Sequence, residues 1–190
     1  MTDKIIIGVA GRIASGKGTI SKYLIDEHKA DRFRSSDPLR ETMDVFDVDQ
    51  SRDNMDALST FLRSTYGENV IAKSVANRIE ESPNPISIFD GIRRLIDVET
   101  FRKLPHFYLL FMDTDVRLRY ERYIKRDENP GDAELTYEEF LERDNREPQQ
   151  QIELLRDHAD YVLNNNGSIS ELDARIREVI TELMAKQKAS

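Results

Sequence analysis

The sequence contains no cysteine. Without cysteine the chain cannot form disulfides, use a thiolate nucleophile or build a zinc–thiolate site. Long apolar runs are absent too, because no stretch approaches the ~20 residues that cross a bilayer as a helix. The first residues, MTDKIIIG, lead directly into a predicted strand and show no signal-peptide pattern. We therefore expect a soluble, cytoplasmic protein with no membrane partner.

The sequence has fewer basic than acidic residues, 28 against 36. The net charge is −8 and the sequence pI is about 5.0, which argues against general binding to nucleic acid or to membrane surfaces. Residues 93–126 nevertheless hold nine basic and five acidic side chains, whereas residues 127–160 hold three basic and twelve acidic ones. We expect the basic stretch to hold an anionic small-molecule substrate. Whether the protein is a monomer or a homo-oligomer stays open.

One glycine-framed stretch has a definite chemical meaning. Residues Gly11–Thr19 read GRIASGKGT, follow the apolar run Ile5–Val9 and precede a helical pattern. This context makes the G-x-x-x-x-G-K spacing a P-loop. Its glycines let backbone N–H groups face a phosphate, and the start of the helix adds partial positive charge. The sequence thus predicts a site for a nucleoside triphosphate, which we take to be ATP, together with Mg²⁺.

The positions of the loop have predicted roles. Lys17 reaches the β- and γ-phosphates, and the hydroxyl of Thr19 ligates Mg²⁺. Asp90 directly follows the predicted strand 86–89 and is the second candidate Mg²⁺ ligand, because that strand should end beside the loop. The predicted nucleotide-binding residues are Gly11, Ala14, Ser15, Gly16, Lys17, Gly18 and Thr19.

Apolar runs and helical periods alternate along the chain. This pattern predicts one three-layer α/β domain over residues 1–190, a P-loop NTPase fold with a five-stranded parallel sheet and ligands at the carboxyl ends of the strands. The first helix should turn Ile20, Leu24 and Ile25 toward the sheet. A long helix should run from Thr136 to about His158 and kink or split at Pro148. The predicted strands cover residues 5–9, 32–34, 86–89, 106–112 and 161–163.

The motifs resemble those of nucleoside monophosphate kinases, adenylate kinase in particular. The loop ends in GKGT, DGIRR resembles the DGFPR segment of that family, and SSDPLR resembles its GDLLR segment. The resemblance implies that Arg40 and Arg94 hold the acceptor phosphate, which the planar fork of arginine can grip through two hydrogen bonds. Arg93 stands where the family has proline, so either Arg93 or Arg94 could be the phosphate ligand. DPLR and DGIR also resemble segments of deoxynucleoside monophosphate kinases.

A further set of arginines resembles the lid of adenylate kinases. Arg119, Arg122 and Arg126 follow i, i+3, i+7 and should share one helix face. Arg122 and Arg126 resemble the R-x-x-x-R that opens the lid. Arg143 and Arg146 resemble the arginines that return from the lid to the transferring phosphoryl group. The resemblance implies a small lid between the first and the last of these four arginines, residues 122–146.

A second likeness is to dephospho-coenzyme A kinases. GRIASGKGT resembles their GGIASGKST, and ADYVLNNNGSISEL is similar to the end of their sequences. This resemblance implies that Asn165, Asn166 and Gly167 contact the adenine of ATP. It also implies a ribose hydroxyl as the acceptor, for which Asp37 would be the natural base.

Together the motifs predict a kinase that moves the γ-phosphoryl group of Mg-ATP to a small nucleotide-type acceptor. A (deoxy)nucleoside monophosphate is the expected acceptor, dephospho-coenzyme A is the alternative, and a regulatory ATPase that transfers phosphate to water is a third possibility. Residues 37–82 should form the acceptor side. The predicted catalytic residues are Lys17, Asp37, Arg122, Arg126, Arg143 and Arg146. The predicted acceptor ligands are Asp37, Arg40 and Arg94, and the metal ligands Thr19 and Asp90.

Overall fold

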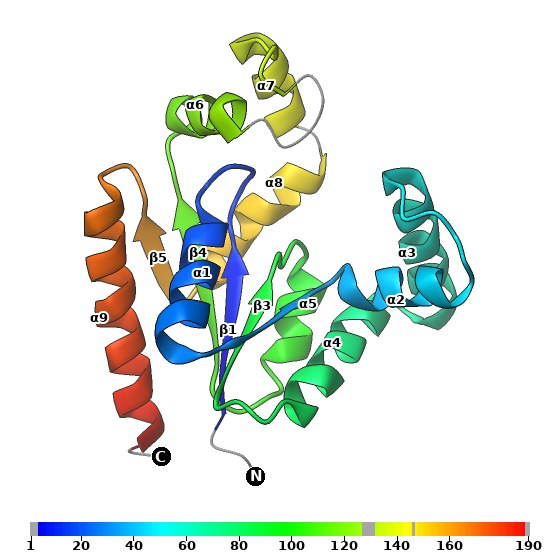
Figure 1. Ribbon diagram of the computed structural model, residues 1–190, viewed down its shortest axis with the longest axis horizontal. Coiled ribbons are helices and arrows are strands. Elements are labelled where there is room, and N and C mark those ends of the chain that lie inside the picture. The colour runs from blue at the N-terminus through cyan, green and yellow to red at the C-terminus, as the bar shows by residue number, and fades with distance from the viewer. Residues whose placement is uncertain (1–3, 127–131, 146, 189–190) are drawn as a thin grey trace.

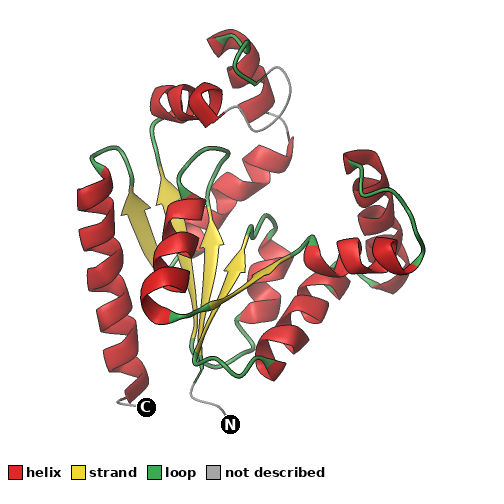
Figure 2. Cartoon of the chain, in the orientation of Figure 1, coloured by secondary structure: helices red, strands yellow, loops and turns green. Residues whose placement is uncertain are grey.

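The computed structural model describes residues 4–126, 132–145 and 147–188 and has three layers (Figures 1 and 2). The middle layer is a sheet with the strand order β2-β3-β1-β4-β5, and every pairing is parallel. The predicted five-stranded parallel sheet is confirmed. Its strands are β1 (Ile5–Ala10), β2 (Asp31–Arg34), β3 (Ile86–Asp90), β4 (Phe107–Asp113) and β5 (Tyr161–Asn164).

Helices connect the strands and cover both faces of the sheet (Figure 1). Such crossover connections are what parallel strands require. The helices are α1 (Lys17–His28), α2 (Asp37–Val45), α3 (Arg52–Tyr66), α4 (Val70–Glu81), α5 (Leu95–Phe101), α6 (Val116–Arg126), α7 (Tyr137–Asp144), α8 (Glu147–Leu154) and α9 (Ile169–Lys188), with a 3-10 turn η1 (Leu155–His158). Within the described ranges, no helix is both long and apolar enough to cross a membrane.

Two apolar clusters hold the layers together. On one face of the sheet Ile7 packs with Leu24 of α1 and Ile176 of α9. On the other face Phe89 and Phe101 belong to a cluster that includes α4, α5 and η1. All six residues of β1 are buried, as expected of a strand covered on both faces. The P-loop therefore follows a strand that is buried along its whole length.

Two predictions on the helices need correction. Ile25 is 36% exposed, and Ser21 is buried instead, because the Ser21 hydroxyl donates to Asp90 (3.3 Å). The helix expected from Thr136 to His158 is divided into α7, α8 and η1. Pro148 lies in the first turn of α8, where its missing N–H costs no intrahelical bond.

Two arms extend from the carboxyl edge of the sheet. Figure 1 shows α6 and α7 above this edge and the pair α2–α3 to one side of it, with the P-loop between them. The α6–α7 arm has a small apolar cluster of its own, which contains Tyr123, Leu135 and Phe140. These arms contain the regions predicted as lid and as acceptor side.

Candidate active site

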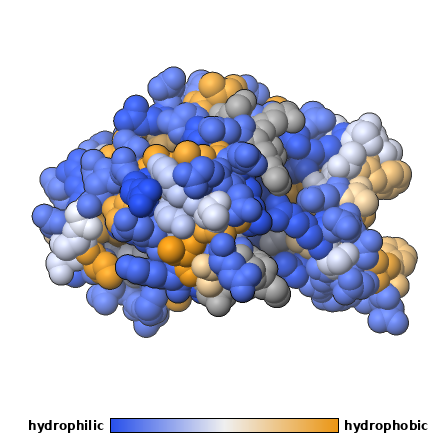
Figure 3. Space-filling view, turned by 90° about the horizontal axis from the view of Figure 1, so that it is seen from above, coloured by the Kyte–Doolittle hydropathy of each residue, from blue (hydrophilic) through white to orange (hydrophobic). Residues whose placement is uncertain are grey.

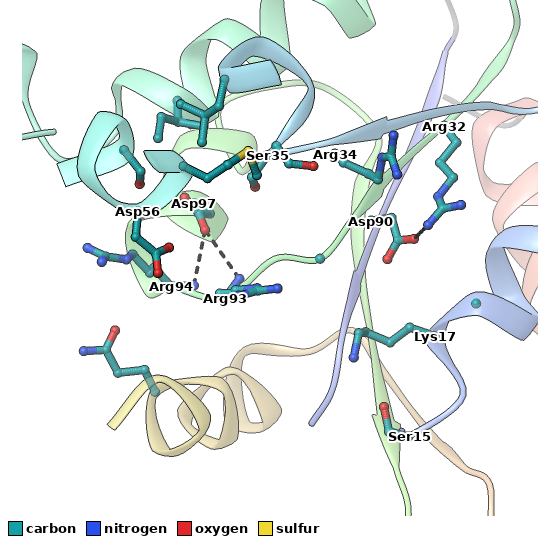
Figure 4. A pocket seen from close by; sticks show the side chains of 18 of the residues that line it. Ser15, Lys17, Arg32, Arg34, Ser35, Asp56, Asp90, Arg93, Arg94 and Asp97 are labelled. Atoms are coloured by element: carbon teal, nitrogen blue, oxygen red, sulfur yellow. Dashed lines mark hydrogen bonds and ion pairs between the residues drawn. The ribbon is translucent and has the colours of Figure 1, made fainter. Parts of the chain in front are cut away.

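A cavity of about 1110 Å³ opens between the P-loop, the α2–α3 arm and α6, and Figure 4 shows the part of it near Lys17, Asp90 and Arg94. Seven arginines and one lysine line it against four carboxylates, which makes it suited to an anionic ligand. Figure 3 looks onto this end of the molecule and shows mostly hydrophilic side chains. The basic lining residues are Lys17, Arg32, Arg34, Arg63, Arg93, Arg94, Arg122 and Arg126. The acidic ones are Asp56, Glu68, Asp90 and Asp97.

The P-loop forms an open cradle at the start of α1. Gly11 and Gly16 have φ angles of +146° and +98°, which glycine adopts without a steric penalty. A Cβ at Gly16 would collide with Asn165, whereas at Gly18 no atom lies within 4 Å of a Cβ position. The predicted loop residues Ala14 to Thr19 all line the cavity. A turn of this shape before a helix N-terminus provides N–H donors for a phosphate.

Lys17 lies at the mouth of this cradle. Its Nζ donates to the carbonyls of Gly11 (2.7 Å) and Arg12 (2.9 Å). Burial lowers the pKa of Lys17 to about 8, the charge of Asp90 opposes this shift, and the charge of Arg93 adds to it. A phosphate in the cradle would supply the negative charge that this ammonium group lacks.

Thr19 and Asp90, the two residues predicted as metal ligands, both line the cavity. Asp90 is 8% exposed, accepts the hydroxyl of Ser21 (3.3 Å) and forms an ion pair with Arg32 (2.5 Å). Mg²⁺ takes oxygen ligands of this kind and commonly uses one or two carboxylates together with substrate phosphates. These residues therefore fit a Mg²⁺ ion. To bind it, Asp90 would give up its ion pair with Arg32.

Two of the predicted lid arginines, Arg122 and Arg126, line the cavity. The Nη1 atom of Arg122 is buried and has no hydrogen-bond partner among the described residues, and burial lowers the pKa of Arg122. The guanidinium of Arg126 lies 5.8 Å from the ring centre of Tyr123. A buried donor without an acceptor is costly unless a ligand supplies one.

Arg93 and Arg94 both reach the cavity but lie on different sides. The buried carboxylate of Asp97 accepts both backbone N–H groups, at 3.4 and 3.2 Å (dashed in Figure 4). Arg94 forms an ion pair with Glu68 (2.9 Å). Figure 4 shows the Arg93 side chain extending toward Lys17 and that of Arg94 directed away from it. Of the two, Arg94 therefore lies beside Glu68 and away from the P-loop, and Arg93 lies nearer to Lys17.

Two side chains expected at the acceptor do not line the cavity. Asp37 accepts the backbone N–H of Arg34 (2.7 Å) and its Nε (2.9 Å), so its carboxylate is engaged at the junction of β2 and α2. Arg40 donates to Oε1 of Gln50 (2.6 Å). Polar partners hold both side chains, Arg34 of β2 in the case of Asp37 and Gln50 between α2 and α3 in the case of Arg40; the resemblance to the kinase motif could not reveal these contacts.

Arg143, in the returning part of the predicted lid, does not line the cavity. Arg143 donates to the hydroxyl of Tyr123 (3.3 Å) and lies 3.8 Å from Asp132. Its side chain is 45% exposed. Arg146 lies outside the described residues. Of the four predicted lid arginines, the structure thus brings Arg122 and Arg126 to the cavity.

One of the predicted adenine contacts, Asn165, supports the P-loop. The side chain of Asn165 is buried and its Nδ2 donates to the carbonyl of Ser15 (2.9 Å). Asn166 accepts the N–H of Asp115 (2.7 Å), and neither of these residues nor Gly167 lines the cavity. Asn165 therefore stabilises the loop, because its amide satisfies a loop carbonyl.

A buried carboxylate joins the P-loop to the α6–α7 arm. Asp144, the last residue of α7, accepts both terminal nitrogens of Arg119 (2.5 and 2.7 Å) and Nη1 of Arg12 (2.9 Å). Burial alone would raise the pKa of Asp144, but hydrogen bonds and charge from Arg119 and Arg12 hold it below its usual value. Arg119 is 4% exposed and does not line the cavity. This arginine therefore stabilises the site from outside, although it was predicted to share a face with Arg122.

Three lining arginines were missed by sequence reasoning. Arg32 and Arg34 alternate along β2, whose carboxyl end meets the cavity, and the strand-end rule could have identified them. Arg63 lies on α3, eight residues after Met55 and four after Ser59, which also line the cavity. This i, i+4, i+8 stripe marks a common helix face, but the sequence could not show which face meets a ligand.

Solved structures share the fold. TT1252 from Thermus thermophilus gives a TM-score of 0.59 at 21% identity, over 95% of this chain and 98% of that one. Shikimate kinase from Bacteroides thetaiotaomicron gives 0.58 at 14% identity, over 93% and 98%. A gluconokinase from Sinorhizobium meliloti gives 0.56 at 12% identity, over 100% and 97%. The predicted P-loop kinase architecture is therefore confirmed at the level of the fold.

Sequence relatives cover nearly the whole chain. No family model matches it. A UPF0200 protein from Methanoculleus marisnigri is 32% identical over 184 residues, 96% of this chain and 99% of the relative. A UPF0200 protein from Hyperthermus butylicus is 31% identical over 180 residues, 95% of each. The chain belongs to the UPF0200 protein family.

Proposed function

We propose that the protein is a P-loop kinase that transfers the γ-phosphoryl group of Mg-ATP to a small acceptor with an anionic group. The cavity carries this proposal, because Lys17 and the P-loop form one end and arginines from four separate segments line the rest. The neighbours named shikimate kinase and gluconokinase support it, since both names denote small-molecule kinases.

The residues at the cavity suit phosphoryl transfer. The reaction needs in-line alignment, charge neutralisation and exclusion of water rather than covalent help from the protein. The P-loop and Lys17 would hold the β- and γ-phosphates, while Arg122 and Arg126 would neutralise charge on the moving group. Mg²⁺, held by Thr19 and Asp90, would supply further neutralisation of the phosphates.

The acceptor that the site supports best is a (deoxy)nucleoside monophosphate. Its phosphate is already anionic near pH 7 and needs no strong base. The runner-up, the ribose hydroxyl of dephospho-coenzyme A, needs a base, and Asp37 was the candidate. Asp37 is engaged by Arg34 and does not line the cavity, which favours the monophosphate.

Asp37→Asn separates these two acceptors. We expect less than a tenfold loss of turnover, because the carboxylate caps the β2–α2 junction and touches no reacting atom. A positioned general base contributes about 10²- to 10⁴-fold, so a loss of that size would favour the hydroxyl acceptor. Steady-state ADP formation is the measurement. Asp53→Asn, in the first turn of α3, is the matched control for altering a carboxylate at a helix start.

ADP release from Mg-ATP with each candidate acceptor in turn tests the proposed function itself. We expect one ribo- or deoxyribonucleoside monophosphate to stimulate the rate strongly. Stimulation by dephospho-coenzyme A alone would move the assignment to the runner-up. Slow hydrolysis that none of these compounds changes would contradict the kinase proposal and favour a regulatory ATPase.

A further inference from the structure

Arg63 lies on the cavity-facing side of α3 with few partners of its own. Its Nη1 donates to Oγ of Ser59, and its Nε is buried without a hydrogen-bond partner among the described residues. Among the described residues, no carboxylate lies within 4.0 Å of the Arg63 guanidinium. A buried guanidinium donor in this state is costly unless a ligand accepts from it.

The nearby carboxylates are already engaged. Glu68 forms its ion pair with Arg94 at 2.9 Å, and Asp97 accepts the backbone N–H groups of Arg93 and Arg94. Burial first, and then the charge of Arg94, lower the pKa of Arg63. This corner of the cavity thus holds the guanidinium groups of Arg63 and Arg94, whose mutual repulsion an anion would relieve, and the charge of Arg93 adds to this repulsion.

We propose that Arg63, together with Arg94, forms the binding site for the anionic group of the phosphoryl acceptor, a phosphate-type dianion. This inference rests on the proposed function and places the site on α3. Arg40, where the likeness to adenylate kinases puts this role, is bound to Gln50 and lies outside the cavity. The planar fork of Arg63 can offer its free Nε together with a terminal nitrogen to one phosphate.

The rest of the α3 stripe gives the acceptor's neutral part a polar surface. Asp56, Ser59 and Thr60 line the cavity beside Arg63, and Met55 lies at the same face. Hydroxyl and carboxylate groups suit hydroxyl or amino groups of a ligand. An acceptor whose phosphate is bound at Arg63 would therefore contact α3 with its neutral part, while the same phosphate, which is its reacting group, faces Lys17.

The test uses inorganic phosphate as the probe, titrated by calorimetry into protein saturated with Mg-ADP, so that the P-loop is filled. A parallel titration uses Lys17→Ala protein without nucleotide. In both settings we expect Arg63→Gln to weaken phosphate binding about 10- to 100-fold, the range for a lost charge-assisted hydrogen bond. Arg63→Lys, which keeps the charge but not the fork, should lie in between.

Arg52→Gln is the matched control, because Arg52 is exposed at the start of the same helix. It should leave the affinity for phosphate unchanged within about twofold, as expected of a distant surface charge. Unaltered thermal midpoints would show that the variants fold. Equal phosphate affinity in Arg63→Gln and the parent protein, or a loss seen in Arg40→Gln instead, would overturn the Arg63 site.

Failure of this site and failure of the kinase proposal remain distinguishable. Binding of Mg-ADP and acceptor-dependent ADP release report on the kinase proposal and do not depend on where the acceptor phosphate binds. Normal nucleotide binding with phosphate affinity indifferent to Arg63 would remove only the α3 site. Phosphate binding that depends on Arg63 in the Lys17→Ala protein would support the site even if no tested acceptor were phosphorylated.

Discussion

The two walls of the cavity are built in different ways. The wall that we assign to the nucleotide, here called the nucleotide wall, rests on β1, in which all six residues are buried. The wall that we assign to the acceptor, the acceptor wall, rests on α3, in which none of the 15 residues is buried. Phe46 and Phe61 of the α2–α3 arm are 72% and 56% exposed, and Figure 3 shows apolar side chains at its outer end.

Polar contacts as well as apolar ones hold the α2–α3 arm to the rest of the molecule. Arg78 of α4 donates two hydrogen bonds to Glu41 of α2, at 2.5 and 2.6 Å, while Leu39 and Met43 are the buried apolar residues of α2. Exposed ion pairs contribute only about 0.2–1 kcal/mol each, whereas a fully buried large apolar side chain contributes about 1.5–3 kcal/mol. We infer from this comparison that the wall assigned to the nucleotide is the more rigid of the two and that the wall assigned to the acceptor can adjust to its ligand.

The largest expected effect is on the nucleotide wall. Lys17→Ala should lower turnover by at least about 100-fold, as removal of a preorganised charge-stabilising donor does, and leave the fold intact. Steady-state ADP release and a thermal unfolding curve are the measurements. Lys22→Ala is the control, because Lys22 is exposed on the same helix beside Asp26. Activity that survived in Lys17→Ala would contradict the assignment of the P-loop.

Substituting one phenylalanine in each wall compares how much the two walls contribute to the free energy of unfolding. Phe101 is fully buried and stacks on Phe89 with ring centres 4.5 Å apart, so Phe101→Ala should cost about 3–5 kcal/mol of unfolding free energy. Phe61→Ala on α3 should change it by no more than about 0.5 kcal/mol, as is usual for exposed sites. Denaturant titration measures both. A similar loss of unfolding free energy in the two variants would contradict this difference, because it would show that Phe61 is buried against another part of the protein.

The smallest expected effect is a pH dependence confined to the nucleotide wall. The pKa of Lys17 is about 8 against an ordinary 10.5, so between these values the unfolded chain binds the proton that the folded chain has lost. Stability should therefore rise with pH in this window. The affinity for ATP should fall by about tenfold from pH 7 to pH 9, because the amine becomes neutral.

Lys17→Arg is the variant that checks this pH dependence, because its charge persists throughout the window. Both trends should disappear in it, as read from nucleotide titrations and unfolding curves at each pH. Affinity for the acceptor phosphate, which we assign to arginines, should stay level across the same window. A parallel fall in acceptor affinity would break the proposed division between the two walls.

Much of the nucleotide wall could be predicted from the sequence, because local patterns encode it. The apolar run before Gly11 and the spacing to Lys17 specified the strand, the loop and the helix, and Asp90 followed from the rule on strand ends. The five parallel strands followed from the alternation of strand and helix patterns. In these places local chemistry and global architecture agree.

The acceptor wall could not be predicted in the same way. The resemblance to kinase motifs named Arg40 and Asp37, but Gln50 and Arg34 hold these side chains outside the cavity. Arg63 lies on a helix with no buried residue, so periodicity alone does not identify its face. Such positions depend on tertiary contacts between exposed polar residues, which leave no pattern in the sequence.

Asp144 has a consequence for how the protein responds to its nucleotide. It binds Arg12 of the P-loop and Arg119 of α6 from the end of α7, so moving α7 away would leave two guanidinium groups without their shared carboxylate. The conformations of the loop and of the α6–α7 arm are therefore thermodynamically coupled, and the coupling is reciprocal. A nucleotide that orders the loop should slow amide hydrogen exchange in α7. A substitution that loosens α7 should in turn lower the affinity of the protein for the nucleotide.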